Sequence, residues 1–467
     1  MLLYYYNNIL FQNPLRNTIL LLIFLAFVTL MGIVLTRIRT DSQKINWIVL
    51  GTMIGLFMIV ATVWILNVPN NQISDFGNFW TRVPGFLVGD KLYETDNDYF
   101  SKYAYQTGFM IYVTSVVRIF GYKIFAIQFL NVIYQGLILL FTYLLVMKIF
   151  NNVKIARLSV FLLLIDLDWF ALNSQASNQY LGSLLYLITF YLLMSNKLSH
   201  YILAGITLTA GCLIRPIGPV IIAGIVVFAL CYVLLKDLDY HRALKILLSL
   251  AIYFVLFSLA GWGIKASGMN AYGLSNNDPE WKFVTGLNYK ASGTYSPDMD
   301  KLIDATKTRA QMRPVETKRL HEEINHLNRT HSWLKLFIDK TQVLWSSRTM
   351  ATDFTSYSLN HSAKTVAIIN FLAYVGSIFL IVFSWIGSLH LFKTKFNNNF
   401  YLLILPLMAF AVVQLIIEVQ GRYRIEFLPV IAMMAGLGLY KVLEFFKGKQ
   451  RLKQTRLDSE QLSKPRN

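Results

Sequence analysis

Eleven apolar runs, most of them near the length of a membrane span, decide what this chain can fold into. A helix needs about 20 mostly apolar residues to cross the roughly 30 Å hydrocarbon core of a bilayer. Backbone polar groups in lipid must pair within their own segment, which favours helices. The runs are residues 18–36, 47–66, 125–147, 155–172, 181–194, 201–213, 217–235, 246–264, 366–391, 401–417 and 427–443. The sequence therefore predicts an all-α polytopic membrane protein.

Composition agrees with this class. Of the 467 residues, 55% are hydrophobic and 15% are charged, with a mean hydropathy of +0.48, whereas soluble proteins carry about 25% charged residues. The first run follows residues 1–17, which hold little positive charge and lead to no small-residue cleavage site. We expect a retained helix there, not a removed signal peptide. Cys212 and Cys231 lie in apolar runs and are expected to be buried, not to form a disulfide or metal site.

Basic residues predict the orientation. The net charge is +18, and Lys and Arg gather in residues 37–44, 148–157, 236–245 and 393–395 and in the tail 447–466. Short basic connections face the cytoplasm. All five do so if segments 67–123 and 266–365 lie outside, which gives 11 spans with the N-terminus outside and the C-terminus inside.

One apolar segment, 109–120, is short and carries Arg118. We expect it to lie along the outer surface; a crossing there would give 12 spans. The predicted domains are an N-terminal segment 1–17, a transmembrane domain 18–443 with outer loops 67–123 and 266–365, and a basic cytoplasmic tail 444–467. The tail is interpreted as an anchor near anionic lipid, not as a nucleic-acid site.

The first outer segment mixes acidic and aromatic residues in a way that suits a sugar site. Flat rings stack on pyranose faces, and carboxylates accept hydrogen bonds from hydroxyl groups; the alternative is an aromatic belt at the membrane interface. The residues are Asp75, Asp90, Glu94, Asp96 and Asp98 with Phe76, Phe79, Trp80, Tyr93, Tyr99 and Tyr103. The chain holds no glycine-rich phosphate loop and no Cys/His cluster with ligand spacing. No nucleotide, metal or other cofactor is therefore predicted.

Charged residues also stand at the ends of later runs. Arg215 lies in the break LIRPIGP, and the turn IEVQGRYRIEFLP carries Glu418, Arg422 and Tyr423. Two arginines and a tyrosine at one membrane surface suit a lipid phosphate, because the planar guanidinium matches phosphate oxygens. The alternative is snorkelling of these side chains to lipid headgroups. Asp166 and Asp168, in LLLIDLDWF, either line the same cavity or cap the helix.

The stretches SDFGNFW, FLVGDKLY and YQTGFMIYVTSVVRIFG, followed by LIRPIG and EVQGRYRIEFLP, resemble the GT-C membrane glycosyltransferases. The most similar branch contains the bacterial proteins related to protein O-mannosyltransferases and aminoarabinose transferases (glycosyltransferase family 39-like). The resemblance runs from about residue 47 to 443. Tyr105-Gln106-Thr107 stands where the family often has Tyr-Pro-Pro, and a single acid, Asp75, stands where some members have a pair.

The resemblance implies a GT-C-like bundle of 11–12 transmembrane helices with two large extracytoplasmic segments. It implies transfer of a sugar from a polyprenyl-phosphate carrier to a glycan, glycolipid or protein acceptor, with inversion. Asp75 would be the catalytic base, and Arg215, Arg422, Tyr423, Tyr105 and Glu418 would bind the substrate and its lipid phosphate. We expect a bacterial plasma membrane, with the active site facing outside. The alternatives are a cell-envelope polysaccharide polymerase or ligase and a lipid-linked sugar transporter or flippase.

Overall fold

The computed structural model describes residues 14–304, 306–346, 350–391 and 397–462, and its regular elements there are all helices. Seven helical segments in this part of the chain are long and apolar enough to cross a membrane. They are α2 (Pro14–Arg37), α3 (Gln43–Asn67), α8 (Ile124–Phe150), α13 (Gly218–Phe228) continued by the π-helical η3 (Ala229–Lys236), α14 (Tyr240–Ala266), α21 (Ala363–Leu391) and η6 (Gly421–Phe427) with α23 (Leu428–Leu462). The predicted all-α polytopic class is confirmed.

Shorter apolar helices account for the remaining predicted runs. Three of them are α11 (Gln179–Leu193), α12 (Leu198–Ile214) and α22 (Tyr401–Val413), the last preceded by η5 (Asn398–Phe400). The run 155–172 is not one continuous helix: it divides into α9 (Val153–Leu164), α10 (Leu167–Phe170) and η2 (Ala171–Ser174). The number of crossings, 11 or 12, stays a prediction.

Two buried acids explain the break after α9. Asp166 and Asp168 are both fully buried, and a buried carboxylate needs a partner. The hydroxyl of Ser377 donates to Asp166 at 2.9 Å, and Arg424 forms an ion pair with Asp168. The chain therefore leaves the helix where these partners can reach it.

Basic side chains tie together the connections at one end of the bundle. Arg157 donates to the carbonyl oxygen of Ile38 at 2.9 Å, which joins the connection after α8 to the connection after α2. Lys148 and Arg242 donate to carbonyl oxygens of residues 191 and 193, at 3.0 and 3.4 Å. The predicted basic connections around these residues therefore share one end. Residues 393–395, which the prediction also included, lie outside the described residues.

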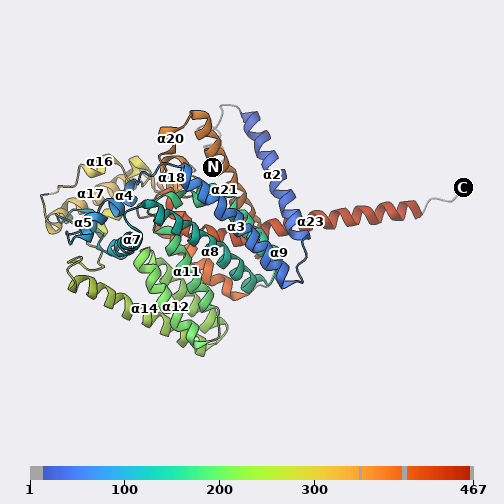
Figure 1. Cartoon of the computed structure of the whole chain (residues 1–467), viewed down its shortest axis with the longest axis horizontal. Coiled ribbons are helices and arrows are strands. Elements are labelled where there is room, and N and C mark those ends of the chain that lie inside the picture. The colour runs from blue at the N-terminus through green and yellow to red at the C-terminus, as the bar shows by residue number, and fades with distance from the viewer. Residues whose placement is uncertain (1–13, 305, 347–349, 392–396, 463–467) are drawn as a thin grey trace.

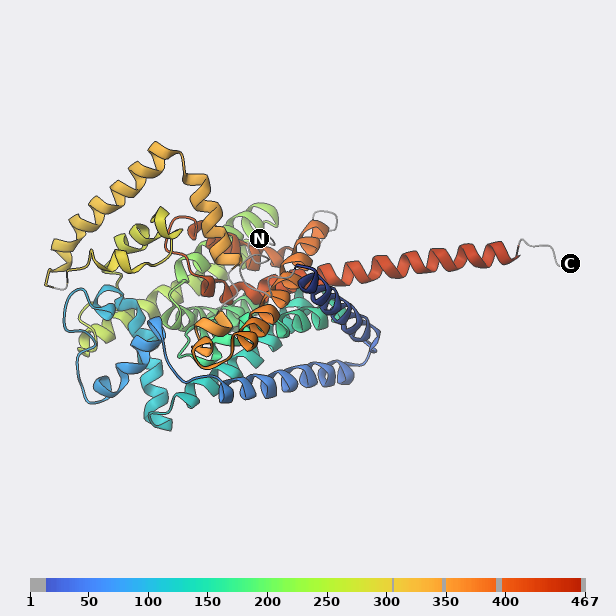
Figure 2. The ribbon, with the colours of Figure 1, turned by 90° about the horizontal axis from the view of Figure 1, so that it is seen from above.

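We call this the tail end, because α23 projects beyond the bundle there (Figure 1). The opposite end, the loop end, gathers the short helices of two long connections, as Figures 1 and 2 show. The first connection holds α4 (Ser74–Thr81), α5 (Val83–Leu87), α6 (Tyr99–Lys102), η1 (Ala104–Gln106) and α7 (Thr107–Phe120). The second holds α15 (Pro279–Gly286), η4 (Tyr289–Ala291), α16 (Pro297–Asp300), α17 (Arg309–Thr330), α18 (Trp333–Ser346), α19 (Met350–Asp353) and α20 (Tyr357–Asn360).

Helix α7 contacts the last turn of α4 near both of its ends. Near its start, the ring of Phe109 lies 4.7 Å from the ring of Phe79. Just after its end, the ring of Tyr122 stacks on Trp80 at 4.2 Å between centroids. Since Phe79 and Trp80 are neighbours in the sequence, both ends of α7 lie near the end of α4, and the surface placement of 109–120 stays a prediction.

Local signals in the sequence set several helix starts. The Ser42 hydroxyl accepts from the backbone of Ile45 at the start of α3, and Thr308 with Gln311 forms a capping box at the start of α17. One expectation was wrong: Cys212 is buried, but Cys231 is exposed, because it lies on the outer side of η3. An apolar run that faces lipid leaves such residues uncovered by protein.

Candidate active site

A cavity of about 800 Å³ lies at the loop end of the bundle. Both long connections and the ends of α12 and α22 contribute to its wall. Part of the wall is apolar, with Pro216, Ile217, Phe354, Phe410 and Ile417. Charged and hydroxyl-bearing side chains lie on the same cavity, and they include Asp75, Tyr105, Arg215, Lys282, Glu418 and Tyr423. A mixed wall of this kind suits a ligand with an apolar part and a polar head.

The segment between α22 and η6, together with the first turn of η6, supplies three side chains that bond in a row. Its backbone pairs with the second connection: Glu418 N donates to the carbonyl oxygen of Lys282 at 2.8 Å, and Val419 N to that of Gly293 at 2.9 Å. Gln420 has an extended backbone, with φ −139° and ψ 147°. Alternate side chains of an extended segment point the same way. Glu418 and Gln420 are therefore presented side by side, and Arg422 follows in the first turn of η6.

These side chains form one continuous chain of hydrogen bonds along the cavity wall. Lys282 Nζ lies 2.7 Å from Glu418 Oε2, and the amide of Gln420 donates to Glu418 Oε1 at 2.6 Å. Arg422 Nε then donates to Gln420 Oε1 at 2.7 Å. The chain ends where Arg422 NH2 donates to Asp75 Oδ2 at 2.5 Å. Each charged group is held by its neighbour, so the geometry of the wall is fixed as a unit.

Asp75 presents a free carboxylate oxygen to the cavity. It lies in the first turn of α4, and its side chain is 35% exposed. Only Oδ2 bonds to Arg422; Oδ1 has no partner within the described residues. Burial raises the pKa of Asp75, but the charges of Arg422 and Lys282 outweigh burial and bring the pKa below its ordinary value. Asp75 is therefore ionised at neutral pH and able to accept a proton at Oδ1.

Arg422 lies behind Asp75 and is only 3% exposed. Its guanidinium carbon lies 4.9 Å from the centroid of the Phe76 ring, 5.5 Å from Phe354 and 5.6 Å from Tyr423. Aromatic faces attract a cation, and more strongly when water is excluded. Arg422 is thus held by rings and by two polar partners, and it orients Asp75.

Arg215 is held differently and keeps donors free. It follows the end of α12, where Pro216 prevents the helix from continuing. Its Nε bonds to buried Glu426, and its guanidinium carbon lies 5.5 Å from the Tyr423 ring centroid. NH1 and NH2 have no hydrogen-bond partner within the described part of the chain, and Arg215 lines the cavity. Two parallel donors on a planar group match two oxygens of a phosphate.

Tyr105 also faces the cavity, from η1. Burial raises the pKa of Tyr105 to about 12, although the charge of Lys282 opposes this. Its hydroxyl therefore stays protonated and can donate a hydrogen bond. For Glu418, burial raises the pKa and the charge of Lys282 lowers it, with a net pKa below the ordinary value. The ion pair of Glu418 with Lys282 therefore persists at neutral pH.

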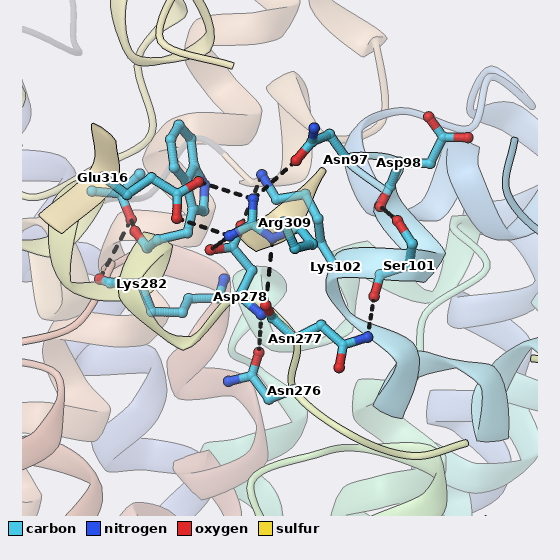
Figure 3. Close-up of polar contacts among 12 residues, drawn as sticks. Asn97, Asp98, Ser101, Lys102, Asn276, Asn277, Asp278, Lys282, Arg309 and Glu316 are labelled. Carbon is cyan, nitrogen blue, oxygen red and sulfur yellow. Dashed lines mark hydrogen bonds and ion pairs between the residues drawn. The ribbon is translucent and has the colours of Figure 1, made fainter. Parts of the chain in front are cut away.

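A second polar network joins the two long connections beside the cavity (Figure 3). Arg309 lies at its centre and contacts Asp278 at 2.5 Å, Glu316 at 2.8 Å and the side-chain oxygen of Asn97 at 2.9 Å. Lys102 Nζ lies 3.0 Å from Asp278, and Lys102 and Asn97 also line the cavity. The network therefore fastens the second connection to the wall that the first connection forms.

Two of these carboxylates belong to a compact acidic group. Oxygen atoms of Asp278, Glu280 and Glu316 lie within 4.8 Å of one another, a spacing that would admit a cation. Arg309 and Lys102 already bond to Asp278, and Arg313 bonds to Glu280 at 2.5 Å. Burial raises the pKa of Glu316 even though Arg309 lowers it. These contacts indicate that the acidic group joins the two long connections through ion pairs.

The six residues predicted from the sequence for the site lie together. Five of them line the cavity: Asp75, Tyr105, Arg215, Glu418 and Tyr423. The sixth, Arg422, contacts Asp75 from behind. Their catalytic and binding roles stay predictions. Asp166 and Asp168 do not line this cavity within the described residues; they are buried beneath it with Ser377 and Arg424.

Two residues of the cavity wall, Lys282 and Gln420, were not among the site residues predicted from the sequence. Gln420 had a limited signal, because it lies two residues from Glu418, which is the period of an extended segment. Lys282 had none: a lysine in a polar connection is ordinary, and only the fold brings it to Glu418.

No family model matches the chain, and no curated protein sequence matches it. Among solved structures, the chain is similar to the archaeal oligosaccharyltransferase AglB from Archaeoglobus fulgidus, in complex with an inhibitory peptide and a dolichol-phosphate (TM-score 0.45, 12% identity over 86% of this chain). The chain spans about half of AglB, 52% of its length. It is also similar to ArnT from Cupriavidus metallidurans bound to undecaprenyl phosphate (TM-score 0.40, 12% identity, covering 83% of this chain and 75% of ArnT).

Both TM-scores lie below 0.5, so the chemistry of the cavity has to indicate what the chain does.

Proposed function

We propose that this protein is a membrane glycosyltransferase that moves a sugar from a polyprenyl-phosphate carrier to a hydroxyl group of an acceptor. The observation that carries the proposal is the pairing of two free groups on one cavity. Oδ1 of Asp75 is an ionised acceptor without a partner, and NH1 and NH2 of Arg215 are donors without a partner, within the described residues. Glycosyl transfer from a phosphate needs one group of each kind.

Asp75 is the proposed base. The acceptor hydroxyl attacks the anomeric carbon while the bond from that carbon to the phosphate oxygen breaks, and Asp75 Oδ1 takes the hydroxyl proton. The transition state is oxocarbenium-like, so the hydroxyl becomes acidic as its oxygen bonds to carbon. Even a carboxylate with a lowered pKa is basic enough to accept the proton of such an acidified hydroxyl. A single base with no nucleophile leads to inversion at the anomeric carbon.

Arg215 is the proposed partner of the leaving phosphate. The departing oxygen gains negative charge that no proton has to neutralise, and a preorganised donor pair stabilises it in the transition state. Tyr423 and Tyr105 line the same cavity and can add hydroxyl donors. Glu418 and Lys282 hold the wall that carries Arg422. In this proposal Arg422 orients Asp75, and Arg215 has the main contact with phosphate.

The apolar part of the wall fits the carrier. Phe410 and Ile417 belong to or follow α22, whose outer side exposes Met408 and Val412. A prenyl chain could therefore lie against this helix while its phosphate reaches Arg215. The tail end carries the basic connections, so the loop end and its cavity are proposed to face outside, in a plasma membrane of bacterial type.

The test is transfer by the purified full chain in nanodiscs, supplied with polyprenyl-phosphate mannose labelled in the sugar and a panel of sugar and peptide acceptors. We expect release of free polyprenyl phosphate together with a labelled product, and loss of both with Asp75→Asn. The matched control is Asp90→Asn, a carboxyl of the same connection that is outside the cavity wall. Full activity of Asp75→Asn at equal protein level would contradict the proposed base.

The alternatives give different products. A flippase would move the intact labelled lipid across the membrane without releasing polyprenyl phosphate. A cell-envelope polymerase or ligase would release a lipid diphosphate or transfer a preformed glycan instead of one sugar. The same nanodisc assay, with analysis of the lipid product by mass spectrometry, separates the three.

A further inference from the structure

A buried amide-rich segment lies directly beneath the site. Residues 173–179 read NSQASNQ, and each of them is at most 3% exposed. Polar residues at membrane depth are expensive unless they serve a purpose. Here their side chains do not line the cavity; those of Gln175 and Gln179 bond to backbone of the two segments that carry Asp75 and Arg422.

The first bond set is a reciprocal pair of glutamines. Gln175 Nε2 donates to the carbonyl oxygen of Asn71 at 2.9 Å, and its Oε1 accepts from the backbone N of Ile73 at 3.2 Å. Gln72 makes the corresponding two bonds to the segment that carries Gln175. Its Oε1 accepts from the backbone N of Ala176 at 2.6 Å, and its Nε2 donates to the carbonyl oxygen of Ser174 at 3.0 Å. Each glutamine thus holds the backbone on both sides of the other, and we call these four bonds the glutamine clamp.

The glutamine clamp ends next to a strained residue. Ser74 has φ +56°, the left-handed region that non-glycine residues rarely adopt. It follows Ile73, whose N–H the clamp holds, and it precedes Asp75. Strained backbone persists only where its surroundings over-determine it. The four bonds of Gln72 and Gln175 supply that constraint.

The same segment also holds the partner of Asp75. Gln179 Nε2 donates to the backbone carbonyl oxygen of Arg422 at 2.6 Å, and Ser177 donates to Gln179 Oε1 at 2.9 Å. One rigid buried segment therefore sets the positions of both members of the ion pair. The Asp75 and Arg422 side chains can rotate about several bonds, and they lie on two separate segments of the chain. A buried segment that contacts both backbones keeps the two side chains together.

We infer that Gln175 and Gln179, with Gln72, are positioning residues. They hold the backbone segments that carry Asp75 and Arg422 so that the two side chains stay at hydrogen-bonding distance. This inference rests on the proposed function, in which Asp75 is the base. Within the amide-rich segment, Gln175 fixes where the Asp75 carboxylate stands, and Gln179 fixes where the Arg422 guanidinium stands. Near-attack geometry is sensitive to displacements of about 1 Å, so loosening either side reduces turnover.

The test compares Gln175→Met and Gln179→Met with Gln135→Met, in the full chain in nanodiscs. Gln135 is a fully buried amide that bonds to Asn173 and contacts neither residues 71–75 nor Arg422 in its described hydrogen bonds. We expect the first two variants to lose kcat by about 10-fold to 100-fold while KM for the donor changes little, and we expect Gln135→Met to keep kcat. In Gln175→Met, the acid limb of the pH profile should move to higher pH, because Asp75 is no longer held against Arg422.

Two further measurements separate positioning from folding and from the proposed function. Hydrogen–deuterium exchange should rise in residues 71–77 in Gln175→Met and in residues 420–424 in Gln179→Met, whatever reaction the protein performs. Adding Ser74→Gly should recover part of the activity of Gln175→Met, because glycine adopts φ +56° without strain. If exchange and the pH profile of Gln175→Met match those of Gln135→Met, the inference is overturned. If exchange changes as expected but Asp75→Asn is fully active, the clamp stands and the proposed function fails.

Discussion

Arg422 donates a 2.5 Å hydrogen bond to Asp75 across 347 positions of sequence. The contact joins the first long connection to the turn before α23, so it closes the wall of the cavity at its centre. Arg422 is almost fully buried among rings, whereas Asp75 keeps one oxygen towards the cavity. The pair is therefore asymmetric: the guanidinium is enclosed by protein, whereas the carboxylate is open to the cavity.

This asymmetry predicts the effect of removing the cation. Arg422 lowers the pKa of Asp75 below its ordinary value, while burial acts in the opposite direction. In Arg422→Met only Lys282 and the more distant Arg215 would still oppose burial, so the pKa of Asp75 should rise. Because the ionised form is the proposed base, the acid limb of kcat/KM should move to higher pH. A pH profile of donor consumption measures this, with exposed Arg313→Met as the control; an unmoved limb would contradict the pairing.

Arg215 should behave as a transition-state contact. In Arg215→Met, kcat should fall by about 100-fold to 1,000-fold, the usual cost of losing a preorganised donor to a developing anion. Arg215→Lys should recover only part of this, since lysine has no planar fork. Arg215 also pairs with buried Glu426, so Glu426→Gln is the control: it perturbs the pair but keeps the two free donors. Equal losses in Arg215→Met and Glu426→Gln would show that the ion pair, and not phosphate contact, matters.

The membrane class and most of the charged residues of the cavity followed from the sequence because their causes are local. Runs of apolar residues predict where helices lie. Pro216 beside Arg215 predicts a helix end that carries a charge. Arg422 stood out because charge near a span end is costly, and Asp75 stood out through its acidic, aromatic segment and the family resemblance. The same reasoning placed Arg422 first as the phosphate contact, with Arg215 beside it.

What separated the two arginines was long-range packing. Phe76 and Phe354 enclose Arg422, and Glu426 occupies one side of Arg215, and no local pattern encodes these contacts. The break of the run 155–172 had the same origin: hydropathy favours one helix there, but the buried Asp168 needs Arg424, and the chain turns to reach it. Segments far apart in sequence meet through such pairs, and only a three-dimensional structure identifies the partner.

The fastening network beside the cavity predicts a loss of stability from one substitution. Arg309→Met would leave the buried carboxylates of Asp278 and Glu316 near each other with Lys102 as the remaining cation. Breaking a buried ion pair on one side costs about 3–5 kcal/mol, because the other charge stays buried. Thermal unfolding in detergent should show a clear drop in Tm. Lys301→Met removes an exposed ion pair with Asp298 and should leave the Tm unchanged.

Lys340 predicts a dependence of stability on pH. It lies on α18, is 1% exposed, and donates to the carbonyl oxygens of Gly286 at 2.6 Å and Ile417 at 2.7 Å. Burial lowers the pKa of Lys340 from 10.5 to about 7, with Glu418 opposing the shift. Between pH 7 and 10.5 the unfolded chain therefore binds more protons at this residue than the folded chain, and stability contributed by Lys340 rises with pH.

The measurement is the free energy of unfolding of the full chain and of Lys340→Met at several pH values. From pH 7 to pH 9 the difference between the two should change by about 2 kcal/mol in favour of the unsubstituted chain, since each pH unit is worth up to about 1.4 kcal/mol. Lys335→Met, on the exposed side of the same helix, should run parallel to the unsubstituted chain. A constant difference for Lys340→Met would mean that the buried amine keeps its proton throughout, held by the two carbonyl oxygens that anchor α18 to the segment leading into Glu418.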